Sequence, residues 1–190
     1  RPATTVATTT TPTTTVDPAA IRSVDFLNFA YPAGACDPKD PRGPFVMTNG
    51  KPLLGEPAPG NEMPTFPIKV EDVIYGDITG DGADEAVVRL TCSKGGTAAW
   101  AIADVFTAAP DGPKRIGVIT PQTSGTDVTL SKLGNIQVVN GAIVVEELVA
   151  VGDDPTCCPS QTRLVSWNFK DGQLTTAAAG TPPATQGLDP

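Results

Sequence analysis

The sequence predicts a mainly β protein, with α+β as the alternative class. We expect an antiparallel β-meander of hairpins with one or two short helices, held together by disulfides. Three observations predict this class. Short apolar runs recur between turn signals rich in Gly, Asn, Asp and Pro. The chain contains 20 Pro and 19 Gly, which leaves little room for long helices. No strand–helix–strand rhythm appears, so a parallel nucleotide-binding sheet is not expected.

The composition limits the function classes that fit the chain. At 190 residues it can bury a sizeable core as one domain. Thirteen basic and 21 acidic residues give a net charge of −8, which argues against nucleic acid and anionic membrane surfaces as partners. The absence of histidine excludes Ser-His-Asp or Cys-His catalysis and His-ligated zinc from this chain alone. The carboxylates of the Gly/Asp loop, residues 77–85, allow a catalytic interpretation by residue type alone, but no catalytic constellation supports an enzyme, so we expect no enzymatic activity.

The two ends of the chain differ in composition from its middle. Residues 1–18 are rich in Thr, Pro and Ala, and we expect a disordered tether there, with an inert tail as the alternative. Residues 19–176 are expected to form a single extracytoplasmic β-rich domain. Residues 177–190 return to an Ala/Thr/Pro/Gly-rich composition and are expected to be a flexible C-terminal tail.

The first part of the predicted domain combines a short element with a long loop. Ala19 to Phe29 has partial helical spacing and could be a short helix or a strand. Asn49-Gly50 is a turn signal, which predicts a small hairpin between Phe45–Thr48 and Lys51–Leu54. The Pro/Gly-rich stretch from Ala33 to Pro67 is long for a loop, so we expect it to pack on the core or to serve a site.

The middle of the chain predicts successive strands. Val70 to Ile74 and Ala86 to Cys92 are apolar runs on either side of a Gly/Asp loop. Ala98 to Thr107 is expected to run antiparallel to the second of them. A Gly-containing turn leads into a strand at Lys114 to Thr120, and Thr126 to Leu130 alternates weakly.

The clearest hairpin lies in the second half of the chain. Ile136–Val139 and Ile143–Val145 are its arms, and Asn140-Gly141 is a turn of the kind that joins adjacent strands. Thr162 to Phe169 alternates between two faces. Asp171-Gly172 then leads into a short last strand at Gln173–Thr176.

The Gly/Asp loop is the one stretch that suggests a binding site. Oxygen-bearing groups fall at positions 1, 3, 5, 7 and 9 from its first aspartate, with Gly82 at position 6, as in loops that wrap Ca²⁺. The bidentate glutamate is absent, because position 12 is Val88, but FG-GAP-like loops bind Ca²⁺ without it. The alternative is a plain Asp/Gly turn with solvated carboxylates. The candidate calcium ligands are Asp77, Thr79, Asp81, the carbonyl of Ala83, and Glu85.

Four cysteines, an even number in a Thr/Pro-rich chain, are expected to form two disulfides in an oxidising compartment. None belongs to a C-x-x-C pair, which argues against a zinc-ribbon or thioredoxin-like site. A bond between neighbouring cysteines is strained. We therefore expect Cys157 and Cys158 to reach different partners, namely Cys36 and Cys92. A redox-active pair is the functional alternative.

The segments D-P-T-C-C-P-S (154–160) and T-R-L-V-S-W-N-F-K-D-G-Q-L (162–174) resemble the actinobacterial lipoproteins called LppP/LprE. That family pairs a C-C-P-[ST] motif with a closing strand and a D-G turn, and it has two further cysteines upstream. The resemblance covers Asp153–Leu174 and extends with less specific motifs back to Val70. It implies an envelope lipoprotein without established enzymatic activity. Membrane attachment is then expected only through the tether or a lipid anchor upstream of Arg1.

These observations lead to two functional expectations. The first is a non-enzymatic accessory subunit of a membrane or envelope complex, a respiratory complex among the candidates, located at the outer face of the cell membrane or secreted. The second is a module in which Ca²⁺ supports binding of a glycan or another envelope ligand. For that module, the candidate residues for stacking on a ligand are Trp100, Trp167 and Tyr75. The alternative for each is that its ring is buried in the core.

Overall fold

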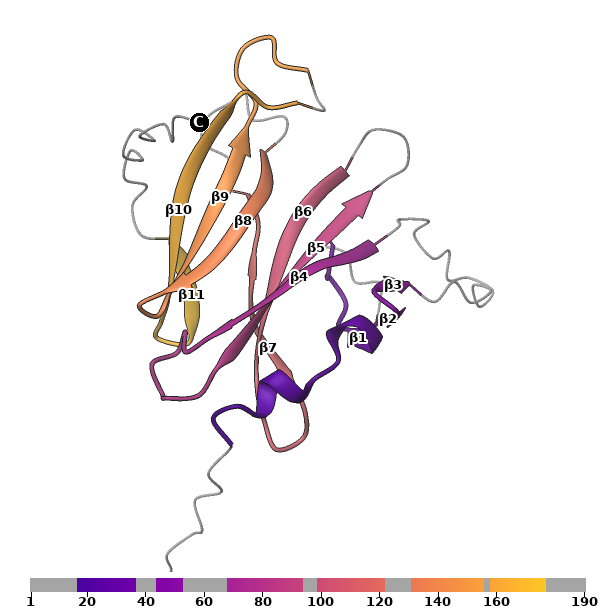
Figure 1. Cartoon of the computed structure of the whole chain (residues 1–190), viewed down its shortest axis with the longest axis vertical. Coiled ribbons are helices and arrows are strands. Elements are labelled where there is room, and N and C mark those ends of the chain that lie inside the picture. Colours follow the sequence, from indigo (N-terminus) through magenta and orange to yellow (C-terminus); the bar gives the residue numbers. More distant parts are fainter. Residues whose placement is uncertain are drawn as a thin grey trace, which may run out of the picture.

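The computed structural model describes residues 17–36, 44–52, 68–93, 99–121, 131–155 and 158–176. Within them the chain forms three antiparallel sheets and two short 3₁₀ helices. The predicted mainly β meander is therefore confirmed. Figure 1 shows two large sheets facing each other, with the N-terminal elements on the far side of one of them.

The N-terminal layer, defined as residues 17–36 and 44–52, holds the 3₁₀ helices η1 and η2 and a small sheet. Asp25 caps η2 by accepting a hydrogen bond from the Leu27 amide, and Asn49 and Gly50 adopt the positive φ of a tight hairpin turn. The first element is thus helical, and the predicted hairpin is confirmed over its described residues. The element bounds are η1 Ala20–Ser23, η2 Phe26–Asn28, β1 Ala30–Tyr31, β2 Phe45–Thr48 and β3 Lys51–Pro52.

The middle sheet has the strand order β4-β5-β6-β7 and confirms the predicted strands on both sides of the Gly/Asp loop, residues 77–85, hereafter the acidic loop. Side chains on both faces of β5 and β6 are buried, which explains their nearly continuous apolar sequence. The bounds are β4 Ile68–Gly76, β5 Glu85–Ser93, β6 Ala99–Thr107 and β7 Lys114–Ile119.

The C-terminal sheet has the strand order β11-β10-β9-β8. Asn140 and Asp171 adopt positive φ, each followed by a glycine that does the same, so both predicted two-residue turns are confirmed. The weakly alternating stretch Thr126–Leu130 lies outside the described residues. The bounds are β8 Ser131–Val139, β9 Ala142–Val149, β10 Gln161–Lys170 and β11 Gln173–Thr176.

Two buried clusters hold these layers together, one on each face of the middle sheet. The N-terminal core joins one face to the N-terminal layer through Ile21, Phe26, Tyr31, Phe45, Met47, Val88, Leu90, Ile102 and Phe106. The C-terminal core joins the other face to the C-terminal sheet through Ile78, Val87, Ala103, Val105, Ile119, Leu133, Ile136, Ile143, Val145, Val165 and Trp167. The middle sheet is therefore the central layer of three.

Glycines allow the edges of the two large sheets to approach closely. A Cβ atom on Gly76 of β4 would lie 2.6 Å from Cγ1 of Val138 in β8. A Cβ atom on Gly117 of β7 would lie 2.3 Å from Cδ1 of Leu174 in β11. Both separations are shorter than a carbon–carbon contact, so only glycine fits these positions without a shift.

The disulfide pairing differs from the sequence-based prediction. Cys36 bonds to Cys92, with 5.9 Å between their Cα atoms, so the predicted bridges from Cys157 and Cys158 to these two residues are wrong. The reason is the layering, because Cys36 and Cys92 belong to the N-terminal core, whereas Cys158 lies in the β9–β10 connection of the opposite sheet. Cys158 is itself disulfide-bonded, and Cys157 lies outside the described residues.

The disulfide indicates an oxidising, extracytoplasmic setting. Of the predicted tether, the structure describes Asp17 and Pro18, and the Pro18 carbonyl accepts a hydrogen bond of 2.8 Å from the Asp84 amide. The predicted C-terminal tail, 177–190, lies outside the described residues. In the part of the chain that the structure describes, no helix has the length and apolar character to span a membrane.

Candidate functional site

The acidic loop, residues 77–85, connects β4 to β5 and is organised around Glu85. This side chain is fully buried at the start of β5. One carboxylate oxygen accepts hydrogen bonds from the amides of Ile78 and Thr79, at 2.9 and 3.0 Å. The other accepts one of 3.0 Å from the hydroxyl of Thr107, the last residue of β6. Glu85 therefore fastens the loop to the neighbouring strand.

The two aspartates of the predicted calcium pattern accept hydrogen bonds from the loop backbone. Asp77 accepts hydrogen bonds from the amides of Gly80 and Gly82, at 2.7 and 3.1 Å. Asp81 accepts one of 2.8 Å from the amide of Ala83. These are the local contacts by which aspartate stabilises a tight turn.

This geometry does not form a ready-made calcium site. Of the candidate ligands, Thr79 and Glu85 are in contact, whereas Asp77 and Asp81 each serve backbone amides. Among the described residues, no group of three or more acidic or cysteine side chains is close enough to hold a metal ion. A bound Ca²⁺ would compete with these donors for the same oxygens. The geometry thus fits a plain structural turn, and the calcium site stays a prediction.

The acidic loop also contacts the N-terminal layer. Arg22 of η1 forms an ion pair of 2.5 Å with Asp84, and its guanidinium lies 4.9 Å from the centre of the Tyr75 ring. Burial raises the pKa of the Tyr75 phenol. One face of the Tyr75 ring is therefore occupied by Arg22.

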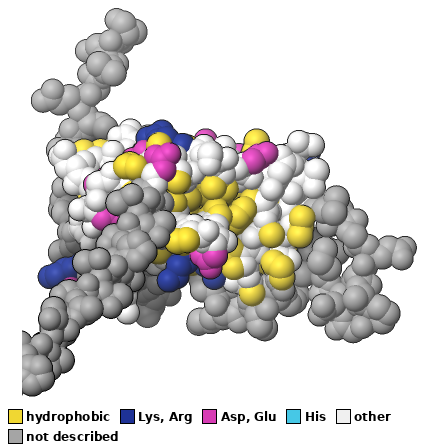
Figure 2. All heavy atoms as spheres, turned by 90° about the horizontal axis from the view of Figure 1, so that it is seen from below, with side chains coloured by type: hydrophobic (Ala, Val, Ile, Leu, Met, Phe, Trp, Pro, Cys, Tyr) yellow, Lys and Arg dark blue, Asp and Glu magenta, His cyan; other side chains and the backbone are white. Residues whose placement is uncertain are grey.

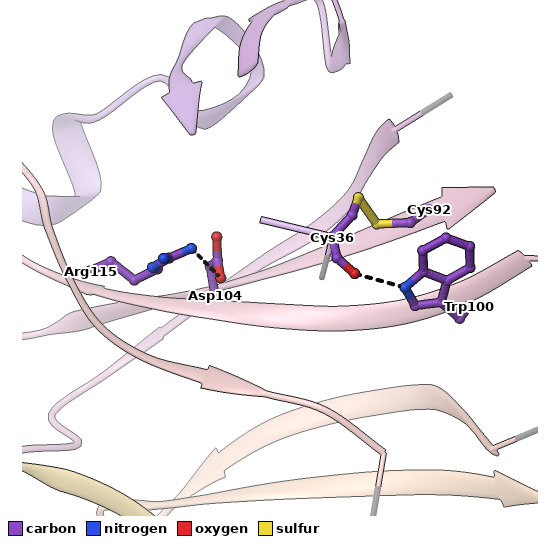
Figure 3. The surroundings of a disulfide bond; sticks show 5 residues. All are labelled: Cys36, Cys92, Trp100, Asp104 and Arg115. Carbon is purple, nitrogen blue, oxygen red and sulfur yellow. Dashed lines mark hydrogen bonds and ion pairs between the residues drawn. A yellow bond between two sulfur atoms is a disulfide. The ribbon is translucent and has the colours of Figure 1, made fainter. Parts of the chain in front are cut away.

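The two tryptophans occupy different cores. Trp167 is 7% exposed and belongs to the C-terminal core, so it is not available for stacking on a ligand. Trp100 is partly buried, and its indole nitrogen donates a hydrogen bond of 2.9 Å to the carbonyl of Cys36. Trp100 therefore links β6 to Cys36, in the stretch of chain that follows β1, beside the disulfide (Figure 3).

Asp104 and Arg115 form a buried pair that the sequence-based prediction missed. Asp104 is fully buried in the middle of β6 and faces the N-terminal core. Arg115 of β7 places one guanidinium nitrogen 3.5 Å from an Asp104 oxygen (Figure 3). Another of its nitrogens donates a hydrogen bond of 2.9 Å to the Ala33 carbonyl. The one signal in the sequence is an aspartate inside the otherwise apolar run of Ala98–Val105.

Burial dominates the electrostatics of this pair. It raises the pKa of Asp104 from 3.8 to about 7, while the positive charge of Arg115 acts in the opposite direction. Neither Asp104 oxygen has a hydrogen-bond donor among the described residues, and 3.5 Å is long for a charge-assisted hydrogen bond. Asp104 is thus a carboxyl group held in an environment that disfavours its charge.

A second buried ion pair belongs to the C-terminal sheet. Glu147 of β9 is fully buried and accepts hydrogen bonds of 2.8 and 2.6 Å from two guanidinium nitrogens of Arg163. The two residues face each other across the β9–β10 pairing. This close pairing satisfies the buried charge, and we assign it a structural role.

Apolar side chains also reach the molecular surface. Leu27 and Val46 of the N-terminal layer are 46% and 49% exposed, and Val139 and Leu164 of the C-terminal sheet are 46% and 43% exposed. Figure 2 shows hydrophobic side chains gathered on the end of the molecule seen from below, with charged groups around them. These positions are candidates for contact with another protein.

A comparison of the chain with protein-family models, with curated proteins and with solved structures finds no match. The resemblance of residues 153–174 to the LppP/LprE lipoproteins therefore stays a prediction.

Proposed function

We propose that this protein is a non-enzymatic extracytoplasmic domain that acts by protein–protein contact, as an accessory subunit of a membrane or envelope complex. Two features support an extracytoplasmic site of action. The Cys36–Cys92 disulfide is characteristic of oxidising compartments. The Thr/Pro-rich composition of residues 1–18 is typical of stalks on secreted proteins.

The observation that carries the proposal is the pair of exposed apolar side chains on the N-terminal layer. Leu27 and Val46 project from a layer that the disulfide, the Trp100–Cys36 hydrogen bond and the Arg115–Ala33 hydrogen bond fix to the middle sheet. A rigid surface loses little conformational entropy when it binds. This layer follows directly after the predicted tether, so a tethered domain would present it close to its attachment point.

Crosslinking of the tagged full-length protein in its native membrane tests the proposal. Mass spectrometry of the purified crosslinked material should show a stoichiometric membrane or envelope partner, with crosslinks from residues 1–18 or 33–67. The same purification from untagged cells sets the background. Recovery of the tagged protein without a stoichiometric partner would refute the accessory-subunit proposal.

A further inference from the structure

Among the described residues, the interface between the N-terminal layer and the middle sheet contains one buried carboxyl group without a hydrogen-bond donor. Asp104 is fully buried there, and both of its oxygens lack a hydrogen-bond donor among the described residues. The other two buried carboxylates of the described chain, Glu85 and Glu147, each accept several hydrogen bonds. Asp104 is therefore the group whose ionisation is least compatible with the closed structure.

In the described part of the chain, few groups lie around Asp104. Arg115 of β7 is the cation, at 3.5 Å. Tyr31 of β1 lies near enough for the Asp104 charge to raise its phenol pKa, although burial is the larger cause and Asp25 and Tyr75 also contribute. The Tyr31 hydroxyl donates to the Phe26 carbonyl at 2.9 Å, so this proton is already used within the N-terminal layer. On the same face β5 contributes the apolar side chains of Ala86, Val88 and Leu90.

Arg115 connects this carboxyl group to the N-terminal layer. The same guanidinium that lies beside Asp104 donates a hydrogen bond to the Ala33 carbonyl, three residues before Cys36. Tyr31, whose phenol pKa the Asp104 charge helps to raise, is only two residues before Ala33. A change in the charge of Asp104 therefore acts, through Arg115 and Tyr31, on the stretch from Tyr31 to Ala33 at the end of β1.

We propose that Asp104 and Arg115 form a pH-responsive clasp, in which protonated Asp104 keeps the N-terminal layer seated on the middle sheet and deprotonated Asp104 favours its local release. The charged carboxylate gains hydration when the layer opens, because the layer is what separates it from water. The Cys36–Cys92 disulfide keeps the chain after β1 attached to β5, so the release is local and reversible.

The sign of the pH dependence follows from the two states. In the open state Asp104 has the ordinary aspartate pKa of 3.8, and in the closed state burial raises its pKa to about 7. Closing therefore takes up a proton, so the closed layer is most stable below the lower value and loses stability as pH rises through the higher one. Between them, the opening constant increases by up to about tenfold per pH unit.

Hydrogen exchange of the disulfide-intact full-length protein tests the clasp. The reporters are the amides of Met47, Gly50 and Val70, which donate to Phe29, Leu27 and Gly50 carbonyls at 2.9, 2.8 and 3.1 Å. After correction for intrinsic exchange, their opening constants should rise at least tenfold from pH 5 to pH 8. Amides of the β9–β10 pairing should not follow this rise.

Matched variants assign the effect to Asp104. Asp104→Asn keeps the shape and removes the charge, so it should abolish the pH dependence of the three reporter amides. Asp72→Asn is the control, because Asp72 also pairs with an arginine, Arg89, but is half exposed; it should behave like the wild type. Equal pH dependence in the wild type and in Asp104→Asn, or none in the wild type, would overturn the proposal.

A carboxyl titration of the wild-type protein by carbon-13 NMR provides a second test that does not depend on a variant. The Asp104 signal should titrate with a midpoint near the raised pKa of about 7, together with the reporter amides. A midpoint in the ordinary aspartate range would overturn the clasp even if Asp104→Asn fails to fold.

Discussion

Glu85, Asp104 and Glu147 are buried carboxyl groups in three different environments. Glu85 accepts hydrogen bonds from two backbone amides and a hydroxyl, and Glu147 accepts them from two nitrogens of one arginine. Asp104 has only an arginine nitrogen at 3.5 Å among the described residues. Only the first position was singled out by sequence, and for a different reason, as a calcium ligand. A one-dimensional pattern shows which residues carry oxygen, but it does not show which donors the fold brings to them.

Replacing Glu85 tests its role as the organiser of the acidic loop. Glu85→Ala leaves the Ile78 and Thr79 amides and the Thr107 hydroxyl without their acceptor, so it should lower the free energy of unfolding by about 3 kcal/mol. Urea denaturation followed by tryptophan fluorescence measures the change. Asp81→Ala is the control, because Asp81 is exposed and accepts one amide, and it should cost less than about 1 kcal/mol. Equal effects of the two variants would contradict this role.

The two interpretations of the acidic loop differ in their response to calcium. Because Asp77 and Asp81 already accept backbone amides, we expect Ca²⁺ to stabilise the protein no more than Mg²⁺ does. A site of extracellular affinity, on the order of 10⁻⁴–10⁻³ M, would instead give a calcium-specific gain of about 1–2 kcal/mol at roughly 5 mM. Thermal unfolding in each ion measures the difference. A calcium-specific gain that Asp77→Asn removes would support the binding-module alternative.

At the scale of secondary structure, local signals predict the hairpins well. The turns at Asn49, Asn140 and Asp171 all have the positive φ that their Asn-Gly or Asp-Gly sequences favour. Contacts between elements distant in sequence could not be predicted in the same way. The disulfide pairing was predicted wrongly because it depends on which face of the middle sheet each cysteine occupies, and no local pattern encodes that choice.

The close approach of β7 and β11 predicts a size-specific defect. Gly117→Ala places a methyl group against Leu174, so it should destabilise the fold by roughly 1–3 kcal/mol. Leu174→Ala removes the obstructing atoms and should cancel much of this cost in the double variant. Urea denaturation of the wild type, both single variants and the double variant measures the coupling. Strict additivity of the two changes would show that the edges do not meet as described.

The Cys36–Cys92 bond makes a prediction about the N-terminal layer. The two cysteines are 56 residues apart, and in the chain-entropy model their bond stabilises the folded state by about 4 kcal/mol. Cys36→Ala with Cys92→Ala should therefore lower the unfolding midpoint in non-reducing buffer. Hydrogen exchange should show the largest loss of protection in the N-terminal layer. Uniform loss across all three layers would argue against a separately anchored layer.

At the scale of the whole molecule, the region between Ala33 and Pro67 belongs to a third layer. Its sequence predicted a long stretch that packs on the core or serves a site and that contains a small hairpin, and its described residues include the hairpin of β2 and β3, which packs on the core. That layer covers the face of the middle sheet opposite the C-terminal sheet (Figure 1). The alternation of β2 places Phe45 and Met47 inward and Val46 outward, so one short strand both closes the core and supplies an exposed apolar residue.

The most direct test of the accessory-subunit proposal compares two exposed apolar pairs in the full-length protein. Leu27→Asp with Val46→Asp changes the N-terminal layer, and Val139→Asp with Leu164→Asp changes the C-terminal sheet; all four side chains are exposed, so both variants should remain folded by circular dichroism. Co-purification of the crosslinked membrane or envelope partner is then quantified for each. We predict that the first variant loses the partner and that the second retains it. Retention by the first variant would contradict the proposed contact surface, and the absence of any partner in the wild type would contradict the proposed function.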